Sequence, residues 1–492
     1  MGEADLVGRI PGGARKLEIR MSLAQRIYPH LPVAGQNLAL AAFGLRYRRQ
    51  RLGPGFDQYV AAFRERDRWS EEMMRSHTVQ RLRELLLWSF QTVPYYTVRW
   101  QEAGIEEGDL AKMDVEDLAG LPITPKEDVR RDPTALVSTT LPRRPRLQRH
   151  LTSGSTGTPT TIYFTPQNVR QAMAVREARS FGWAGVSVRM PRSTIGARLV
   201  APQTDSNGPV YRYNPIEHQL YLSAHHISRE NLPSYVEGFN RYRPQVLTGF
   251  AYSHYLLARL MLAEGVRLQY QPQAAVLGSD KITPPMKATI AEAFGARAFE
   301  EYGAVENCVL ATECTEGSLH VSPDFGILEI LDADGAPAAP GQPGRLICTG
   351  LLNRAQPLIR YAIGDLGAWS KRHCSCGRDG LPVLESIVGR DTDVVVMRDG
   401  RRLNTAVALI FTGARGVAEG QVVQDGYEDF TIRVVPTTEF GVEQEEKLKI
   451  ALRKRIGDVR IRVQTVEELE KTTSGKSRLV ISRLRDNNDH NG

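Results

Sequence analysis

The sequence lacks the marks of a membrane protein or of a disulfide-stabilised secreted protein. No apolar run reaches the roughly 18 residues that a membrane-spanning helix needs. The start of the chain has no signal-peptide pattern. Five cysteines, an odd number among 492 residues, do not form the paired framework of a disulfide-rich domain. We therefore expect a cytoplasmic protein with no membrane association.

Charge of one sign is also not concentrated in any part of the chain. The 63 basic and 56 acidic residues give a net charge of +7, and they are spread along the whole length. Binding of nucleic acid requires a clustered basic surface, which this distribution does not offer. A mild positive excess suits small anionic substrates such as nucleotides. A length of 492 residues exceeds what one hydrophobic core supports, so we expect two or more domains.

One short segment concentrates glycine and hydroxyl side chains. Residues 151–160 read LTSGSTGTPT, and the residues that would hold phosphates are Thr152, Ser153, Gly154, Ser155, Thr156 and Gly157. Glycine lets backbone N–H groups approach a ligand closely, and the hydroxyls donate to phosphate oxygens. The segment is not a Walker A loop, because no Gly-Lys-Ser/Thr follows at the required spacing. Taken alone, it also fits an ordinary polar surface turn.

Four later segments follow this loop in order. They are Phe299–Glu306 (FEEYGAVE), Ile359–Asp365 (IRYAIGD), Gly389–Asp393 (GRDTD) and Lys471–Lys476 (KTTSGK). With the loop, they resemble the motifs of the adenylate-forming superfamily of acyl-CoA synthetases, peptide-synthetase adenylation domains and luciferases. The similarity covers about residues 85 to 480. The stretches Val93–Tyr96 (VPYY) and Cys374–Arg378 (CSCGR), with EYGAVE, resemble the phenylacetate–CoA ligase-like branch.

The resemblance and the local patterns together predict an α/β fold with layered sheets and helices. We expect a disordered leader over residues 1–20, a large AMP-binding domain over 21–389 and a small mobile α+β lid domain over 390–492. The pivot between the two domains is expected at residues 390–393, because this short polar segment can absorb changes of φ and ψ.

Local patterns predict individual elements within these domains. Residues 57–93 have helical periodicity, with Val79, Leu82, Leu85, Leu86, Phe90 and Val93 on one face, and Pro94 ends the last helix. A second helix opens at Thr283-Pro284-Pro285 and closes at Gly295. We predict strands at residues 274–277, 325–331, 345–348, 394–397 and 430–435, and a basic helix at 445–456.

The resemblance implies a ligase that converts an aromatic carboxylic acid and ATP into an acyl-adenylate with release of pyrophosphate. ATP and Mg²⁺ are the implied cofactors, and coenzyme A is the default acceptor of the acyl group. The motifs that activate the acid do not specify the acceptor, so an amine, a hydroxyl or a carrier-protein thiol stays open. So does a degenerate homologue that binds nucleotide without ligase activity. We expect a monomer or a homodimer, with no nucleic-acid partner.

The resemblance also assigns roles to single residues. Tyr302 would stack on adenine, with Gly278, Ser279, Glu301 and Gly303 lining the same nucleotide-binding segments. Asp365 and Arg390 would bind the ribose, since a carboxylate accepts from both hydroxyls and a guanidinium donates. Glu306 would hold magnesium. Lys476 would carry its charge onto the α-phosphate and the carboxylate during adenylation.

Two positions depart from the family pattern. Residue 160 is threonine where the family usually ends the phosphate loop with lysine, so another cation must balance the phosphate charge. Residue 305 is valine where the family more often has a hydroxyl residue that contacts the α-phosphate. These departures favour the degenerate alternative, whereas Asp365, Arg390 and Lys476 weigh against it.

Cys314, His320, Cys374 and Cys376 form a separate group. Thiolates and imidazole suit a closed tetrahedral zinc site, and similar cysteines in the phenylacetate–CoA ligase-like branch imply a structural metal. His373 is an alternative ligand. The spacing differs from a standard zinc ribbon, and buried free cysteines are common, so a metal-free cluster also fits the sequence.

Overall fold

The structure is a computed structural model of the chain. It describes residues 27–141, 147–152, 159–197, 200–201, 208–279 and 282–390, and in the C-terminal part 395–398, 402–403, 407, 410–411, 414–467, 469 and 480–484. The expected leader, residues 153–158 of the phosphate loop, the pivot residues 391–393 and Lys476 lie outside this description. No helix in the described ranges combines the length and apolar content needed to cross a membrane.

The first part of the described chain is helical. Its elements are η1 (Tyr28–His30), α2 (Val33–Arg51), α3 (Phe56–Arg66), α4 (Glu71–Thr92), α5 (Pro94–Glu102), α6 (Glu107–Leu110), η2 (Glu116–Gly120) and α7 (Lys126–Arg131). The apolar face predicted for α4 is confirmed, because Val79, Leu82, Leu85 and Leu86 are buried. Pro94 ends α4 as predicted and also begins α5, since a proline without N–H fits the first position of a helix.

The centre of the molecule is a sheet of 12 strands in the order β11-β12-β13-β14-β10-β9-β8-β7-β6-β3-β5-β4. Its parallel part consists of β3 (Arg192–Gly196), β5 (Gln219–Ser223), β6 (Val246–Phe250), β7 (Ala274–Gly278) and β8 (Arg297–Gly303), with β4 (Tyr211–Asn214) antiparallel at the edge. The predicted strand at 274–277 is β7. Parallel strands need crossover helices, so both faces of this part are covered.

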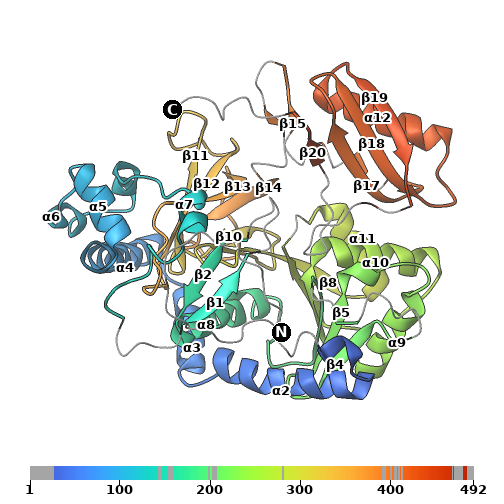
Figure 1. Ribbon diagram of the computed structural model, residues 1–492, viewed down its shortest axis with the longest axis horizontal. Coiled ribbons are helices and arrows are strands. Elements are labelled where there is room, and N and C mark those ends of the chain that lie inside the picture. Colours follow the sequence, from blue (N-terminus) through green and yellow to red (C-terminus); the bar gives the residue numbers. More distant parts are fainter. Residues whose placement is uncertain are drawn as a thin grey trace.

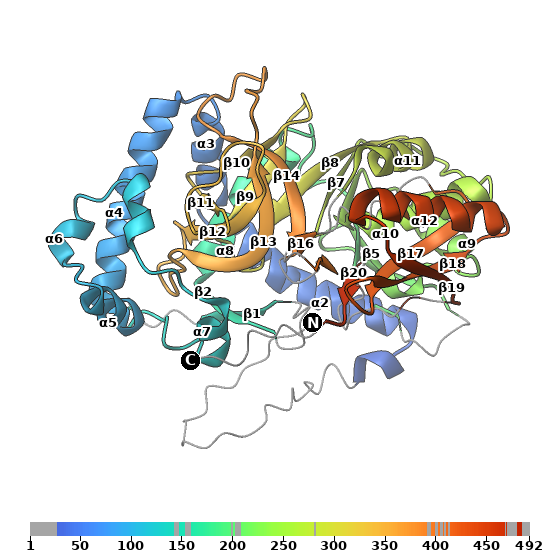
Figure 2. The same ribbon diagram turned by 90° about the horizontal axis from the view of Figure 1, so that it is seen from above.

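The two faces carry different helices (Figures 1 and 2). On one face, Leu247, Leu277 and Ala298 pack against α9 (Leu232–Tyr242), α10 (Ala251–Ala263) and α11 (Pro284–Phe294). On the other face, Val246, Val276 and Phe299 pack against α3, α8 (Pro166–Arg176) and the π-helical turn η3 (Glu177–Phe181). The predicted ends of α11 are confirmed, because the Thr283 side chain accepts from the Met286 N–H and Gly295 has φ 72°.

The other half of the sheet is antiparallel. It contains β9 (Leu310–Glu313), β10 (Leu319–Val321), β11 (Gly326–Leu331), β12 (Gly344–Gly350), β13 (Tyr361–Trp369) and β14 (Val383–Arg390). The strands predicted at 325–331 and 345–348 are β11 and β12. The turn between them is closed by Asp332, whose carboxylate accepts from the Ala336 N–H at 2.9 Å.

A small α+β unit follows β14, at the upper right of Figure 1. Its elements are the pair β15 (Val395–Val396) and β16 (Arg402–Leu403), and the sheet of β17 (Val417–Gln424), β18 (Asp429–Pro436), β19 (Arg460–Thr465) and β20 (Val480–Ser482), covered by α12 (Val442–Ile456). Phe430, Ile432 and Val434 bury one face of the sheet against α12. The α/β fold with a small α+β unit is therefore as predicted, and the proposed boundary falls at the end of β14.

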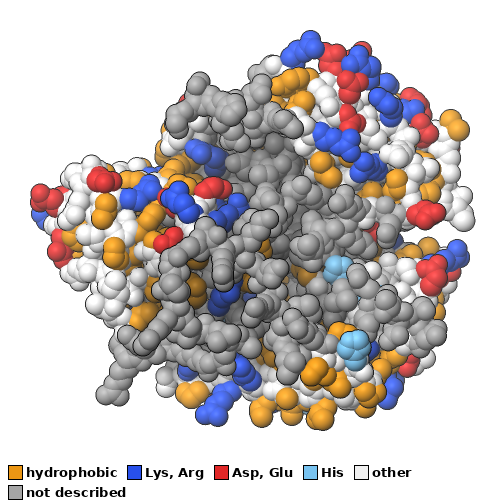
Figure 3. Space-filling model, viewed as in Figure 1, with side chains coloured by type: hydrophobic (Ala, Val, Ile, Leu, Met, Phe, Trp, Pro, Cys, Tyr) orange, Lys and Arg blue, Asp and Glu red, His pale blue; other side chains and the backbone are white. Residues whose placement is uncertain are grey.

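The surface of the small unit mixes both signs of charge, as the blue and red side chains in Figure 3 show. On α12, Glu443 pairs with Lys447 at 2.6 Å and Glu445 pairs with Lys449 at 2.7 Å, each at helical i,i+4 spacing. Such alternation is typical of a solvated helix face.

Candidate active site

The predicted nucleotide residues meet where the central parallel strands end. Gly278, at the end of β7, is the register partner of Glu301 on β8. A Cβ on Gly278 would lie 2.5 Å from the Glu301 carbonyl oxygen, so only glycine fits there. Ser279 follows with φ 68°, a left-handed turn away from the sheet. Glu301, Tyr302 and Gly303 are each partly exposed although β8 is a central strand, which leaves accessible surface at this edge.

Tyr302 and Asp365 are in direct contact. The Tyr302 hydroxyl donates to Asp365 Oδ2 at 2.8 Å. Burial, reinforced by the Asp365 carboxylate, raises the pKa of Tyr302 well above its ordinary value, so the hydroxyl stays a neutral donor. Asp365 on β13 is also the register partner of Arg390 on β14, whose side chain lies outside the description. The structure thus brings the predicted adenine and ribose residues together.

Glu306, the predicted magnesium ligand, is buried beside β13. The Tyr361 hydroxyl donates to Glu306 Oε1 at 3.2 Å, and Lys126 Nζ lies 3.6 Å from the same oxygen. Lys126 also donates to the Ile363 carbonyl at 3.0 Å. Glu306 therefore already faces one cation, and a divalent ion bound there would share the carboxylate with Lys126. Val305, the second departure from the family pattern, points its side chain outward and is 39% exposed.

Lys126 was missed by the sequence analysis. It occupies the first position of α7, directly after Pro125. The preceding Thr124 is fixed to β13, because its N–H donates to the Arg360 carbonyl at 2.9 Å and its carbonyl accepts from the Ala362 N–H at 3.0 Å. The sequence offers one local signal, a Thr-Pro-Lys helix start, but nothing in it links that start to Glu306.

The phosphate loop is closed at its base. The strands β1 (Gln148–Leu151) and β2 (Thr161–Phe164) pair around it. Thr152 Oγ1 accepts from the Thr160 N–H at 2.8 Å, and the Thr152 N–H donates to the Thr160 carbonyl at 3.0 Å. Thr160 is fully buried, which suits a small uncharged side chain. The other predicted loop residues, Ser153, Gly154, Ser155, Thr156 and Gly157, lie outside the described part of the chain.

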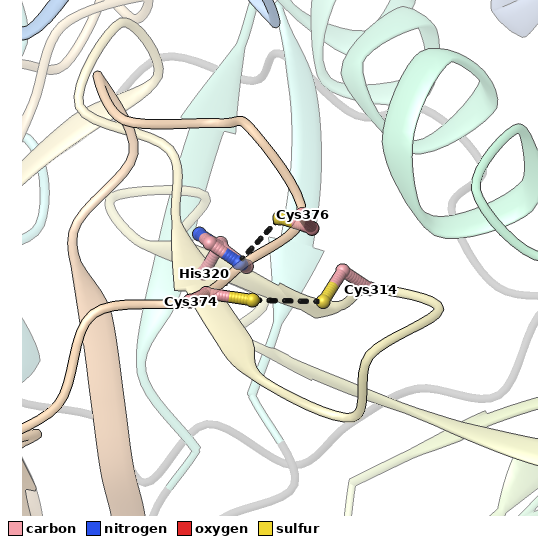
Figure 4. Close-up of side chains that lie close together, drawn as sticks. All are labelled: Cys314, His320, Cys374 and Cys376. Carbon is pink, nitrogen blue, oxygen red and sulfur yellow. Dashed lines mark hydrogen bonds between the residues drawn. The ribbon is translucent and has the colours of Figure 1, made fainter.

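The predicted cysteine and histidine group comes together at the far end of β9. One ligand atom from each of Cys314, His320, Cys374 and Cys376 lies within 4.8 Å of the others (Figure 4). Cys314 Sγ and Cys374 Sγ are 3.6 Å apart, and Cys376 Sγ and His320 Nε2 are 3.3 Å apart. His373, the alternative ligand, is exposed and does not join this group.

The donor set fits a zinc ion. In a tetrahedral site with Zn–S bonds of about 2.3 Å, two sulfur atoms lie about 3.8 Å apart, close to the observed spacing. His320 Nδ1 donates to the Leu381 carbonyl at 2.8 Å, which directs the unprotonated Nε2 towards the cysteines. Burial lowers the pKa of His320, which favours the neutral imidazole that a metal requires. A bound zinc would join the β9–β10 hairpin to the segment that precedes β14.

Comparison with known proteins agrees with this architecture. The profile of the CapK C-terminal domain matches residues 396–483. Protein CapK of Staphylococcus aureus is 25% identical over 474 residues, which cover 93% of this chain and 99% of CapK. Phenylacetate–coenzyme A ligase of Thermus thermophilus is 28% identical over 336 residues, covering 66% of this chain and 72% of that enzyme.

Among solved structures, 2-hydroxyisobutyryl-CoA ligase in its postadenylation state superposes with a TM-score of 0.67 at 20% identity, over 85% of this chain and 91% of that one. In its thioesterification state, the same ligase superposes with a TM-score of 0.52. Fold, motif order and curated relatives agree: the chain is similar in sequence to phenylacetate–CoA ligases and in fold to an acyl-CoA ligase of the adenylate-forming type.

Proposed function

We propose that the protein is an ATP-dependent ligase that converts a carboxylic acid into an acyl-adenylate, releases pyrophosphate and transfers the acyl group to an acceptor. The observation that carries the proposal is the meeting of Gly278, Tyr302, Glu306 and Asp365 at one end of the sheet, from three separate segments. Attack of a carboxylate on the α-phosphorus builds charge on anionic oxygens, so catalysis rests on positioning and on cations.

Each residue has a part in this reaction. The Tyr302 ring offers a face for adenine, and Asp365 accepts from the ribose hydroxyls. Glu306 would hold Mg²⁺, which supplies positive charge to the phosphates when bound. The hydroxyl and N–H groups of Thr152, Ser153, Gly154, Ser155, Thr156 and Gly157 would hold the outer phosphates. Lys476 would neutralise the developing charge on the reacting oxygens, and Arg390 would donate to the ribose or a phosphate.

Lys126 is our candidate for the cation that replaces the missing loop lysine. Its ammonium lies beside Glu306 and is mostly buried, with 13% of the side chain exposed. A buried ammonium is screened little by solvent, so its field at a nearby phosphate is strong. The family's lysine reaches the phosphates from the loop itself, whereas Lys126 would approach from α7. The departure at Thr160 therefore does not require an inactive protein.

Coenzyme A is the proposed acceptor, because several curated relatives are phenylacetate–coenzyme A ligases. Protein CapK, which matches 93% of this chain, has a name that specifies no acceptor. An amide- or ester-forming ligase therefore stays the second candidate, and a degenerate nucleotide-binding homologue the third. We propose in addition that Cys314, His320, Cys374 and Cys376 hold a structural zinc ion.

ATP–pyrophosphate exchange tests the proposal. The purified protein is incubated with MgATP, labelled pyrophosphate and a panel of aryl and aliphatic acids, and the Asp365→Ala variant is the control. Acid-dependent exchange that the variant loses supports adenylation. Binding of ATP by calorimetry without exchange for any acid would assign the protein to the degenerate alternative. Coenzyme A, hydroxylamine and glycerol are then compared as acceptors by the rate of AMP formation.

A further inference from the structure

Arg360, the residue directly before β13, has a backbone conformation that residues with a side chain rarely adopt. Its φ is 45°, in the left-handed region that favours glycine. The residue is also buried, with 4% of its surface exposed. A conformation of this kind is costly, persists only where the surroundings fix it, and is most frequent at functional sites. The contacts of Arg360 explain why the chain tolerates this cost.

The guanidinium of Arg360 joins two segments that are far apart in the sequence. Nη2 donates to Glu329 Oε1 at 2.9 Å and Nε donates to Glu329 Oε2 at 3.1 Å, which makes a bidentate pair with strand β11. Nη1 donates to the Ala119 carbonyl at 3.0 Å and to the Leu121 carbonyl at 2.5 Å. These carbonyls lie at the end of η2 and directly after it, in the segment that leads to α7. Arg360 therefore fixes that segment to the sheet.

The backbone of Arg360 holds the same segment a few residues later. Its carbonyl accepts from the Thr124 N–H at 2.9 Å, and its N–H donates to Thr349 Oγ1 on β12 at 3.0 Å. Lys126 is only two residues after Thr124, and Pro125 restricts the backbone between them. The start of α7, and with it the root of the Lys126 side chain, is therefore fixed by contacts of one residue.

Both members of the Lys126–Glu306 pair are placed against β13. Lys126 Nζ donates to the Ile363 carbonyl at 3.0 Å and lies 3.6 Å from Glu306 Oε1. Tyr361, the residue after Arg360, donates through its hydroxyl to the same Glu306 oxygen at 3.2 Å. The ammonium and the carboxylate thus keep their spacing only while α7 and β13 keep theirs. Arg360 joins these two elements at the start of β13.

We infer that Arg360 is a positioning residue for the ligase reaction, because it sets the place of the Lys126 ammonium beside Glu306 and the phosphates. The inference rests on the proposed function and adds a residue that acts through another. The Arg360 side chain is 5% exposed and is bonded to a carboxylate and two carbonyls of the protein, so it does not itself meet the substrate. A displacement of about 1 Å in a group that acts on the reacting atoms costs as much as about 100-fold in rate.

A double-mutant cycle separates positioning from stability. Arg360→Lys keeps a positive charge beside Glu329, but one nitrogen in place of three cannot bond the carboxylate and both carbonyls from their present positions. Glu329→Gln is the matched control, since it weakens the buried ion pair and leaves both carbonyl bonds in place. Each change is made alone and together with Lys126→Met in the full-length protein. Pyrophosphate exchange at saturating MgATP, ATP affinity by calorimetry and melting temperature are measured for every variant.

We expect Arg360→Lys to lower the maximal exchange rate about tenfold and to leave the ATP affinity within about twofold of the wild type. Combined with Lys126→Met, it should lower the rate no further than Lys126→Met alone, because both changes remove the same interaction. Glu329→Gln should lower the melting temperature and keep the rate within about twofold. The inference is wrong if the two losses multiply in the combined variant, if Arg360→Lys keeps the wild-type rate, or if Glu329→Gln loses as much rate.

Chemical labelling tests the same point without turnover. Reductive methylation, followed by mass spectrometry of peptides, should be slow at the mostly buried Lys126 and fast at the exposed Lys112. Arg360→Lys should speed the labelling of Lys126, and Glu329→Gln should not. If Arg360→Lys does not fold, Arg360→Met combined with Glu329→Leu removes the buried pair without leaving an unpaired charge, and the same results as for Arg360→Lys are expected.

The two measurements distinguish failure of the inference from failure of the proposed function. If no acid supports exchange in the wild type, while the labelling of Lys126 responds to Arg360→Lys and not to Glu329→Gln, Arg360 still positions Lys126 and the ligase function is rejected. If exchange is present and the labelling of Lys126 is the same in all variants, the ligase function stands and the inference is overturned.

Discussion

The two ends of strand β9 contrast in how they treat polar side chains. At the Leu310 end, β9 pairs with Gly303, where Tyr302 and Gly303 are partly exposed. Beyond the Glu313 end, Cys314 and His320 are fully buried. Cys314 Sγ lies next to Cys374 Sγ, and His320 Nε2 lies next to Cys376 Sγ. Tyr302 and Gly303 keep solvent access for a diffusing ligand, whereas the two metal donors on the β9–β10 hairpin, Cys314 and His320, are closed off and Cys374 and Cys376 are only partly exposed. Strand β9 thus connects the proposed nucleotide-binding edge to the proposed structural zinc site.

The surroundings of the cysteine end fit a structural role. Arg179 is buried on η3 and donates to Asp67 at 2.7 Å and to Asp324 at 2.7 Å. Arg66 donates to the same Asp324 at 2.6 Å. Although burial opposes it, the field of Arg179 lowers the pKa of Asp324, so this carboxylate stays ionised. Breaking one partner of such a buried network leaves a charge uncompensated, which costs about 3–5 kcal/mol.

The contrast predicts that variants at the nucleotide end lose activity without losing stability, and that variants at the cysteine end do the reverse. The largest loss of activity is expected for a variant of Lys476. Loss of one charge that stabilises the developing anion typically costs about 10²–10³ in rate, so Lys476→Ala should nearly abolish pyrophosphate exchange. Its melting temperature should equal that of the wild type. Lys454→Ala, an exposed lysine at the end of α12, is the control. Exchange at the wild-type rate in Lys476→Ala would remove the role assigned to this residue.

Asp365→Ala should weaken ATP binding next most strongly. It removes acceptors for the ribose and the partner of the Tyr302 hydroxyl, and a hydrogen bond to a charged group contributes about 1.5–3 kcal/mol. We expect a loss of about 10- to 100-fold in ATP affinity by calorimetry, with the affinity for the acid unchanged. Asp334→Ala, in an exposed turn, should bind ATP normally. Unchanged ATP affinity in Asp365→Ala would contradict the ribose assignment.

Lys126→Met should have a smaller effect, about tenfold on the exchange rate, because other cations remain at the phosphates. The expected change is in the maximal rate at saturating MgATP. Lys112→Met, whose side chain is exposed, serves as control. A wild-type rate for Lys126→Met would show that the ammonium serves only to neutralise Glu306, and the missing loop lysine would then need another replacement.

Local patterns in the sequence were enough for elements whose ends are set by their own residues. The caps of α11 and the buried face of α4 are of this kind, since proline, glycine and apolar spacing act within a few residues. Helix α2 was not predicted, because it buries Gln36 and exposes Leu38 and Leu45. Gln36 is buried as the acceptor for Arg212, a partner that only the folded chain supplies.

The residues of the candidate active site likewise fall into two groups, those that a sequence motif identifies and those that only the folded chain identifies. Tyr302, Glu306 and Asp365 were found through motifs, and the structure brings them to one edge. Lys126 was not found, because its position beside Glu306 depends on segments that are distant in the chain. An isolated lysine or arginine in a sequence is most often a solvated surface residue. Contacts between segments that are far apart in the chain are what sequence patterns do not encode.

Cys374→Ser tests the cysteine end of β9, and among these variants it should change the rate of pyrophosphate exchange least. Zinc should copurify at about one ion per chain in the wild type and fall to a small fraction in the variant. Each kcal/mol lost lowers the melting temperature of a large domain by about 2–4 °C, so we expect a drop of about 5 °C or more. Ser375→Ala, between the two cysteines, should keep both zinc and stability.

The folded fraction of Cys374→Ser should exchange pyrophosphate within about twofold of the wild type, because the cysteine group lies at the opposite end of β9 from Tyr302. Elemental analysis without zinc, in wild-type protein purified in the absence of chelator, would reject the metal. If instead zinc is present and its loss lowers exchange in parallel with stability, the two ends of β9 are coupled. In that case the metal contributes to activity as well as to stability, because it positions the nucleotide-binding edge.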